Sequence, residues 1–250
     1  MTRVLGFFRR HDGLTQIAIV LGSLEAYEVS RHFIRPDWPA AFEHAERIMA
    51  LERWMHFAWE QSLQKVFLEV PELIKAMNMF YFVGHFILTG LFFLWLYWRS
   101  REGFRSFRNG FLFATAIALF IHWTFPTAPP RLVDGLGLED TLRVFSHINI
   151  GSPNTPSYAN PVAAVPSLHA GWAVGVAVGI IRYSRSRALK MLGAVYPLVV
   201  VLTIIVTGNH FLFDAVAGIL VMGIGFLVAR ALTRPPGRPK KEKLTRCYTC

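Results

Sequence analysis

Long runs of apolar residues alternate with short polar segments along most of this chain. Several of these runs approach the roughly 20 residues that an α-helix needs to cross a bilayer. We therefore predict an all-α, polytopic integral membrane protein with six transmembrane helices. The predicted spans cover residues 14–34, 76–98, 108–127, 166–183, 188–207 and 209–230.

The segment between the first two spans follows a different pattern. Between residues 38 and 75, apolar residues recur at helical spacing among charges of both signs, which predicts an amphipathic helix at the membrane interface. The first span is the weakest, because Glu25 and Glu28 interrupt it. Its basic start and apolar continuation lack a convincing cleavage site, so we expect an uncleaved signal anchor.

These patterns divide the chain into four parts. We expect a signal-anchor helix over residues 1–37, an interfacial amphipathic region over 38–75, a membrane-embedded catalytic helix bundle over 76–232 and a disordered basic cytoplasmic tail over 233–250. Both cysteines, Cys247 and Cys250, lie in the tail and cannot cross-link a core. We expect a pair of reduced thiols; the C-x-x-C spacing is weak evidence for metal binding or lipidation.

The charges of the chain indicate its orientation. Charged residues make up 17% of the chain, whereas a soluble domain usually has about 25%. Of the 26 basic residues, 18 lie in the N-terminus, the loops after spans two and four, and the tail. Six spans place these four segments on one side, which the positive-inside rule makes cytoplasmic. Both termini are then cytoplasmic, and the net charge of +10 reflects topology rather than a nucleic-acid partner.

The stretch "TGNHFLFDAVAG", residues 207–218, places two ionisable groups in an apolar run. Such groups are costly in a membrane and are a functional-site hypothesis by default. If span six begins near residue 209, His210 and Asp214 lie at i and i+4 on one helical face. The aspartate can then fix the imidazole tautomer and leave the other nitrogen free to attack an electrophile. A polar pair that joins two helices is the alternative.

Two further motifs fall on the same outer side. In "AVPSLHAGW", residues 164–172, Pro166 suits a helix start and Ser167 is a natural N-cap, so His169 lies in the first turn, beside backbone N–H groups that favour an anion. In "FPTAPPRL", residues 125–132, prolines end span three and Arg131 offers a guanidinium suited to phosphate. A capped helix with an incidental histidine and a generic interfacial arginine are the alternatives.

A softer signal is "NMFYFVGH" in span two. Asn78, Tyr81 and His85 form one polar stripe that either bonds neighbouring helices or lines a substrate pocket. Asn209 is a similar case, and we expect structural roles for His122 and His147. The sequence contains no metal-binding motif and no Gly-rich nucleotide loop, so we expect no metal and no cofactor.

At "PSLHA" and "GNHFLFD" the sequence resembles the type 2 phosphatidic acid phosphatase superfamily, which consists of integral-membrane phosphoester enzymes. The resemblance is closest to its inositol phosphotransferase branch, which includes the inositol phosphorylceramide synthases, and "FPTAPPRL" and "NMFYFVGH" resemble that branch too. The likeness covers about residues 45–225, with the motifs in the right order.

The resemblance implies a six-helix core and a two-step transfer. His210 would attack phosphorus to form a phosphohistidine, with Asp214 orienting it. His169 would protonate the leaving alcohol and later activate the acceptor. Ser167, the amides at the helix start and Arg131 would stabilise the phosphoryl oxygens.

The sequence departs from the phosphatase members at two places. Their K-x6-R-P motif is absent, and the arginine expected six residues before the nucleophilic histidine is Ile204. Both departures favour the transferase branch and leave Arg131 to take over part of the lost role.

The leading functional hypothesis is an enzyme that cleaves a membrane lipid phosphate or phosphodiester at the extracytoplasmic face. The phosphoryl or head group would pass to water or to an alcohol such as inositol; the oligomeric state is left open. The alternatives are a proton-coupled transporter and a non-catalytic membrane scaffold. A transporter should place its ionisable groups near mid-membrane, whereas here they gather at one interface. We expect the protein in a cell membrane, the bacterial inner membrane in our interpretation.

Overall fold

The computed structural model describes residues 36–152 and 160–233, together with five isolated positions (13, 15, 16, 19 and 22). Within these residues the regular elements are helices, and an isolated bridge pairs Thr127 with Ala163. In chain order the helices are α3 (Trp38–Trp54), α4 (Glu60–Leu68), α5 (Pro71–Met79), the π-helix η1 (Phe80–Gly84), α6 (His85–Arg99), α7 (Arg101–Thr124), the 3-10 helix η2 (Pro130–Leu132), α8 (Thr141–Ser146), α9 (Leu168–Tyr183), α10 (Arg187–Val206) and α11 (Leu212–Thr233).

The segment predicted as one amphipathic helix over residues 38–75 is divided into three helices. After α3, His56 adopts a left-handed conformation with φ of 58°. After α4, Val70 leaves the helical conformation (φ −126°, ψ 82°), as expected for the residue before a proline. Helix α5 then begins at Pro71 and runs through η1 into α6. Residues 71–75, which were predicted to be interfacial, therefore belong to the second apolar helix.

Four helical stretches are long and apolar enough to cross a membrane, namely Pro71–Arg99, Arg101–Thr124, Arg187–Val206 and Leu212–Thr233. Helix α9 is apolar but has 16 residues, about 24 Å at 1.5 Å per residue. The span predicted over residues 14–34 and the tail from residue 234 lie outside the described ranges. The all-helical class is confirmed for the described residues, and four of their helices are candidates to cross a membrane, whereas the number of six spans remains a prediction.

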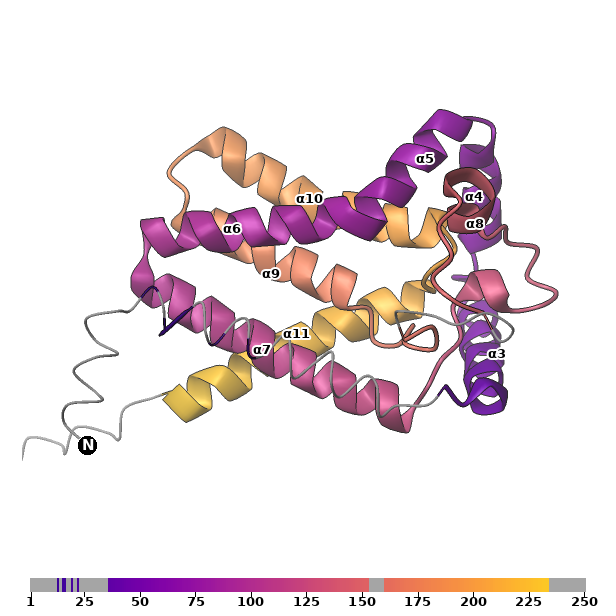
Figure 1. The fold of residues 1–250 in the computed structure, drawn as a ribbon, viewed down its shortest axis with the longest axis horizontal. Helices are drawn as coiled ribbons and strands as arrows, with labels where there is room; N and C mark the ends of the chain where they lie inside the picture. The colour runs from indigo at the N-terminus through magenta and orange to yellow at the C-terminus, as the bar shows by residue number, and fades with distance from the viewer. Residues whose placement is uncertain are drawn as a thin grey trace, which may run out of the picture.

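Helix α9 occupies the centre of the bundle, in contact with α6, α7, α10 and α11 (Figure 1). Glycines at every fourth position, Gly171, Gly175 and Gly179, let its neighbours approach closely. A Cβ at Gly171 would lie 2.6 Å from the carbonyl oxygen of Gly218 on α11. The central helix is thus surrounded by four others, and its beginning lies against the beginning of α11.

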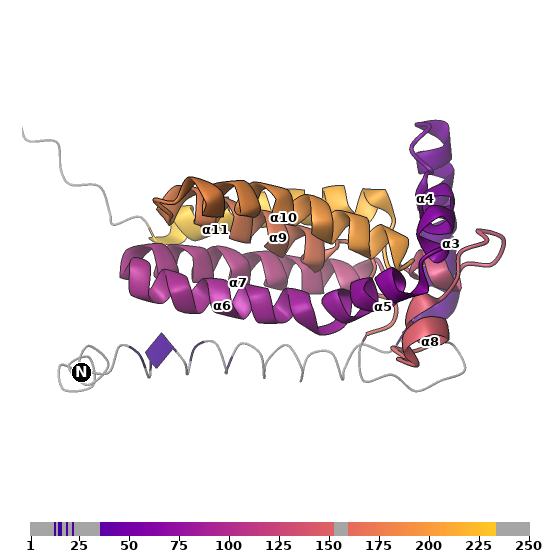
Figure 2. The same ribbon diagram turned by 90° about the horizontal axis from the view of Figure 1, so that it is seen from above.

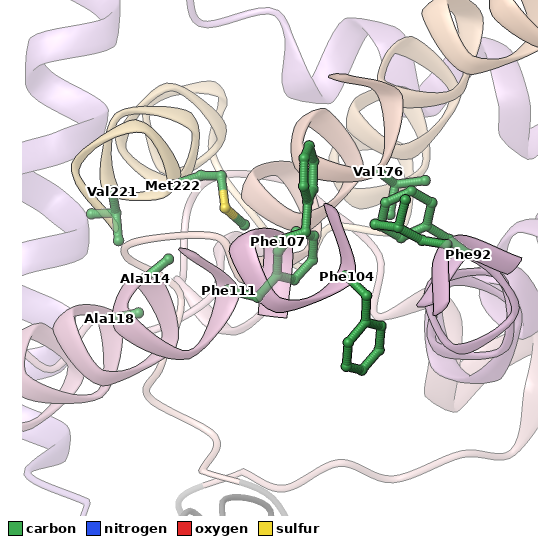
Figure 3. Close-up of a cluster of buried hydrophobic side chains, with 10 residues drawn as sticks. Phe92, Phe104, Phe107, Phe111, Ala114, Ala118, Val176, Val221 and Met222 are labelled. Atoms are coloured by element: carbon green, nitrogen blue, oxygen red, sulfur yellow. The ribbon is translucent and has the colours of Figure 1, made fainter. Parts of the chain in front are cut away.

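A cluster of buried apolar side chains joins α6, α7, α9 and α11 (Figure 3). The rings of Phe92 on α6 and Phe107 on α7 meet edge to face, with centroids 5.9 Å apart. Val176 of α9 and Met222 of α11 complete the contact. Edge-to-face aromatic pairs add to the stability gained from burial alone. This packing holds in place the helices that carry the residues of the site described below.

One end of the bundle carries the irregular structure. Helices α3 and α4 run across the axes of the long helices there, and α8 lies beside them (Figures 1 and 2). The segments that follow α7 and α10 return to this same end, whereas the turns between α6 and α7 and between α9 and α10 lie at the opposite one. The arginine-rich turns predicted to face the cytoplasm are therefore remote from the segments that carry the motifs.

Candidate active site

His210 lies in the turn between α10 and α11, not within the helix as predicted. Gly208 makes this turn with φ of 69°, and the N–H groups of Asn209 and His210 both donate to the carbonyl oxygen of Ile204. Helix α11 begins only at Leu212. The predicted placement of both residues on one helical face is therefore wrong, because the chain is still turning at His210.

The side chains of His210 and Asp214 nevertheless meet. Nδ1 of His210 lies 3.3 Å from Oδ2 of Asp214 and 2.9 Å from the carbonyl oxygen of Ala164. Both neighbours are acceptors, so Nδ1 is the nitrogen that carries the proton, and Nε2 keeps its lone pair. Burial lowers the pKa of His210 to about 4, although the hydrogen bond to Ala164 acts to raise this pKa. The imidazole is therefore neutral at neutral pH.

The beginning of α9 is built as predicted. The Oγ atom of Ser167 accepts a hydrogen bond from the N–H of Ala170 and caps the helix, with His169 in the first turn. The backbone N–H of Ser167 donates to the carbonyl oxygen of Asp214 at 2.9 Å. A Cβ at Gly218 would lie 2.0 Å from the carbonyl oxygen of Ser167. Two motifs far apart in the sequence are thus joined through their backbones.

The rings of His169 and His210 lie side by side, with centroids 5.8 Å apart. Tyr81 stacks on His169 at 4.4 Å and lies 6.4 Å from His210. His169 is hydrogen-bonded to the backbone of Tyr81. Its Nε2 has no hydrogen-bond partner among the described residues, so the bond to Tyr81 uses Nδ1. Each histidine therefore has Nδ1 held by the protein and Nε2 available to a ligand.

His85 lies behind His169, on the side of α10. Its ring centroid is 5.0 Å from that of His169, and its Nδ1 is 2.8 Å from the hydroxyl group of Tyr196. Its Nε2 has no partner within the described part of the chain. Tyr81 and His85 of the predicted polar stripe thus lie beside the two histidines.

Arg131 enters the site from η2, which follows α7. Its Nη1 donates to Oδ1 of Asn209 at 2.8 Å, its Nε lies 3.3 Å from Oδ1 of Asp140, and its backbone N–H donates to Gly208. The side chain is 2% exposed, and burial lowers its pKa while the charge of Asp140 raises it. Arg131 and Asn209 therefore form one unit beside His210.

The remaining candidates have structural partners. Asn78 donates to the carbonyl oxygen of Thr141 and to Oγ of Ser146, so it ties α5 to α8. His122 lies 3.2 Å from the carbonyl oxygen of Pro166, and His147 ends α8 in a left-handed conformation. Within the described ranges, no three His, Cys, Asp or Glu side chains are grouped to hold a metal ion.

Sequence reasoning missed three partners of the site. The carbonyl oxygen of Ala164 holds His210, and no side-chain pattern could indicate it. Glu52 and Glu60 hold the first turn of α11 through Phe213 and Leu212. The position of Glu52 could have been noticed in the sequence, because Glu52 continues the buried face of α3, where apolar residues are expected.

A family model described as the PAP2 superfamily matches residues 46–228. Neither the curated proteins nor the solved structures contain a match. The matched range contains Arg131, His169 and His210 and covers well over half of the 250 residues. The chain therefore belongs to the PAP2 superfamily.

Proposed function

We propose that this protein is an integral-membrane lipid phosphoesterase that works through a phosphohistidine. Members of the PAP2 superfamily are generally phosphatases, which supports an enzyme that acts as a lipid phosphatase. The observation that carries the proposal is the pairing of His169 and His210 at 5.8 Å, with Nδ1 of each occupied by the protein. This leaves two imidazole Nε2 atoms for one phosphoryl group.

In the first step, Nε2 of His210 attacks phosphorus and forms a P–N bond. The bond from phosphorus to the ester oxygen breaks, and its electron pair stays on that oxygen. The protonated ring of His169 gives its Nε2 proton to the leaving oxygen, so an alcohol departs. Asp214 and the carbonyl group of Ala164 hold the His210 ring while positive charge develops on it.

In the second step, His169 takes a proton from water or from an alcohol. The activated oxygen attacks phosphorus, the P–N bond breaks, and His210 is regenerated as a neutral imidazole. Water gives phosphate release, and an alcohol such as inositol gives transfer. The transferase reading is supported by Ile204, which stands where phosphatase members have an arginine and is buried among apolar side chains.

Arg131 supplies the positive charge that the phosphoryl oxygens require. Its Nη1 and Nε atoms are engaged with Asn209 and Asp140, which leaves Nη2 as the donor for phosphate. Free N–H groups at the start of α9, next to Ser167, add a second set of donors. Asn209 acts through Arg131 in this scheme, while Tyr81 and His85 line the pocket.

We place the reaction at the extracytoplasmic face of a cell membrane, with both termini in the cytoplasm. The separation of the two ends supports this placement: the site lies at the α3–α4 end, and the arginine-rich turns lie at the other. The gathering of His169, His210 and Arg131 at one end also favours an enzyme over a transporter, which needs ionisable groups near mid-membrane.

The deciding experiment compares purified wild type, His210→Ala and Asp214→Asn in EDTA, with a panel of lipid phosphates and phosphodiesters, with and without inositol. His147→Asn is the control, because asparagine tolerates the left-handed backbone at that position. Mass spectrometry quantifies phosphate and lipid products together. We expect turnover in wild type and the control only. Phosphate release identifies a phosphatase, and a new lipid that carries the head group identifies a transferase. Full turnover by His210→Ala overturns the proposal.

A further inference from the structure

The first turn of α11 is capped by carboxyl groups from the two helices that cross the end of the bundle. The N–H of Leu212 donates to Oε1 of Glu60 at 3.2 Å, and the N–H of Phe213 donates to Oε1 of Glu52 at 2.7 Å. Glu52 and Glu60 are only 2% and 7% exposed. Two buried glutamates from α3 and α4 therefore hold the helix that follows His210.

This arrangement replaces the usual cap of a helix. The first N–H groups of a helix have no partner within it, and the residue before the helix normally supplies a side-chain oxygen. Phe211 occupies that position and has none. Asp214 reaches back to the N–H of Phe211 at 2.9 Å, as the acidic member of a capping box does. The next two N–H groups are left to Glu52 and Glu60.

The two glutamates share one proton. Their side chains are hydrogen-bonded to each other, which requires that one carboxyl group be protonated. Burial raises the pKa of Glu52 to about 9, and the hydrogen bond and charge of Glu60 on α4 and the charge of Asp214 on α11 act in the same direction. At neutral pH, Glu52 therefore donates its O–H to Glu60 while its Oε1 accepts from Phe213.

We propose that the Glu52–Glu60 pair is a positioning device for the nucleophile, which holds the first turn of α11 so that Nε2 of His210 faces His169. The inference rests on the proposed function, because it assigns the pair to the same site. In this proposal, α3 and α4 lie across the end of the bundle and each contributes one carboxyl group to the helix start that follows His210.

The alternative is a cap that stabilises the fold without influence on the reaction, and paired substitutions at residue 52 separate the two. Glu52→Gln mimics the protonated carboxyl group: its oxygen accepts from Phe213, its amide donates to Glu60, and it cannot lose a proton. Glu52→Ala removes both bonds. Glu46→Gln and Glu46→Ala are the matched controls, because Glu46 lies on the same helix and is exposed.

The kinetic test measures kcat and KM between pH 6 and pH 10 in detergent micelles, with the lipid that wild type turns over in the panel above. We expect wild-type kcat to fall as the pH rises through about 9, when a second negative charge appears beside Glu60. Glu52→Gln should keep kcat near wild type and lack this fall. Glu52→Ala should lower kcat about 100-fold with little change in KM, as expected for a displaced nucleophile.

Three kinetic results overturn the proposal: an unchanged kcat in Glu52→Ala, the same alkaline fall in Glu52→Gln, or an equal loss in both variants. If Glu52→Ala does not fold, the pH profile of Glu52→Gln decides alone. Both substitutions at Glu46 should behave as wild type.

A second readout needs no substrate. Hydrogen–deuterium exchange of residues 207–216 should accelerate in Glu52→Ala and remain at the wild-type rate in Glu52→Gln. Unchanged exchange in Glu52→Ala overturns the positioning role whatever the reaction is. Turnover that survives His210→Ala overturns the proposed function instead, so the two failures are distinguishable.

Discussion

The guanidinium group of Arg131 is fastened to Asn209, with Nη1 2.8 Å from Oδ1, so a buried cation is fixed next to the residue that precedes His210. The resemblance to the phosphatase members implies an arginine six residues before His210. This chain has Ile204 at that position. Arg131, in η2, instead supplies a buried positive charge beside Asn209. The backbone bond from Arg131 to Gly208 fixes the same turn.

Arg131→Lys should lower kcat/KM about 100-fold, although the charge is kept. A lysine ammonium cannot contact Asn209 and Asp140 and also present a second donor to phosphate, whereas the planar guanidinium can. Steady-state kinetics with the identified lipid tests this, with Arg143→Lys on the exposed face of α8 as the control. Equal activity of Arg131→Lys and wild type would exclude a role in phosphate binding.

The acid limb of kcat/KM should lie near pH 4 and not near 6.5. Burial lowers the pKa of His210 to about 4, so its imidazole stays neutral, and able to attack, until the pH falls that far. The unfolded chain takes up this proton already below about pH 6.5, so stability from His210 declines between about 6.5 and 4. A rate profile from pH 3.5 to 8 tests the prediction, and an acid limb at 6.5 contradicts it.

Gly218→Ala should separate the two histidines. The new Cβ would lie 2.0 Å from the carbonyl oxygen of Ser167, so the start of α9 must move away from α11 and carry His169 with it. We expect a lower Tm in detergent and a loss of activity of about 100-fold. Gly223→Ala is the matched control on the same helix, because nothing lies within 4 Å of its Cβ. It should keep activity and gain up to about 1 kcal/mol from helix propensity.

Asn78→Ala should weaken the fold and spare the chemistry. The side chain bonds Thr141 and Ser146 of α8, and the loss of a buried hydrogen-bond partner costs about 1–3 kcal/mol. Thermal unfolding should show a lower Tm, while kcat and KM stay close to wild type. Met79→Ala, at an exposed neighbouring position, serves as the control. A raised KM at unchanged Tm would instead support the pocket role suggested by the polar stripe.

Much of the local structure follows from the sequence alone. Apolar runs of the right length predict the helices over 188–207 and 209–230 to within a few residues, and Ser167 caps α9 as its chemistry suggests. These features depend on residues that are neighbours in the chain, so the sequence pattern predicts them. The helix break at Val70 is also a local feature, because Pro71 causes it. It was not predicted, because the apolar residues across 38–75 keep a helical spacing.

Only the tertiary structure decided how the site is held. His210 is oriented by the carbonyl oxygen of Ala164, Arg131 by Asn209, and the first turn of α11 by Glu52 and Glu60. Each bond joins segments that are distant in the sequence, and each depends on how helices pack around α9. The sequence by itself determined which residues could carry out the chemistry, because residue type and helix position are local properties. The partners of these residues depend on long-range packing, which the pattern of apolar residues along the chain does not indicate.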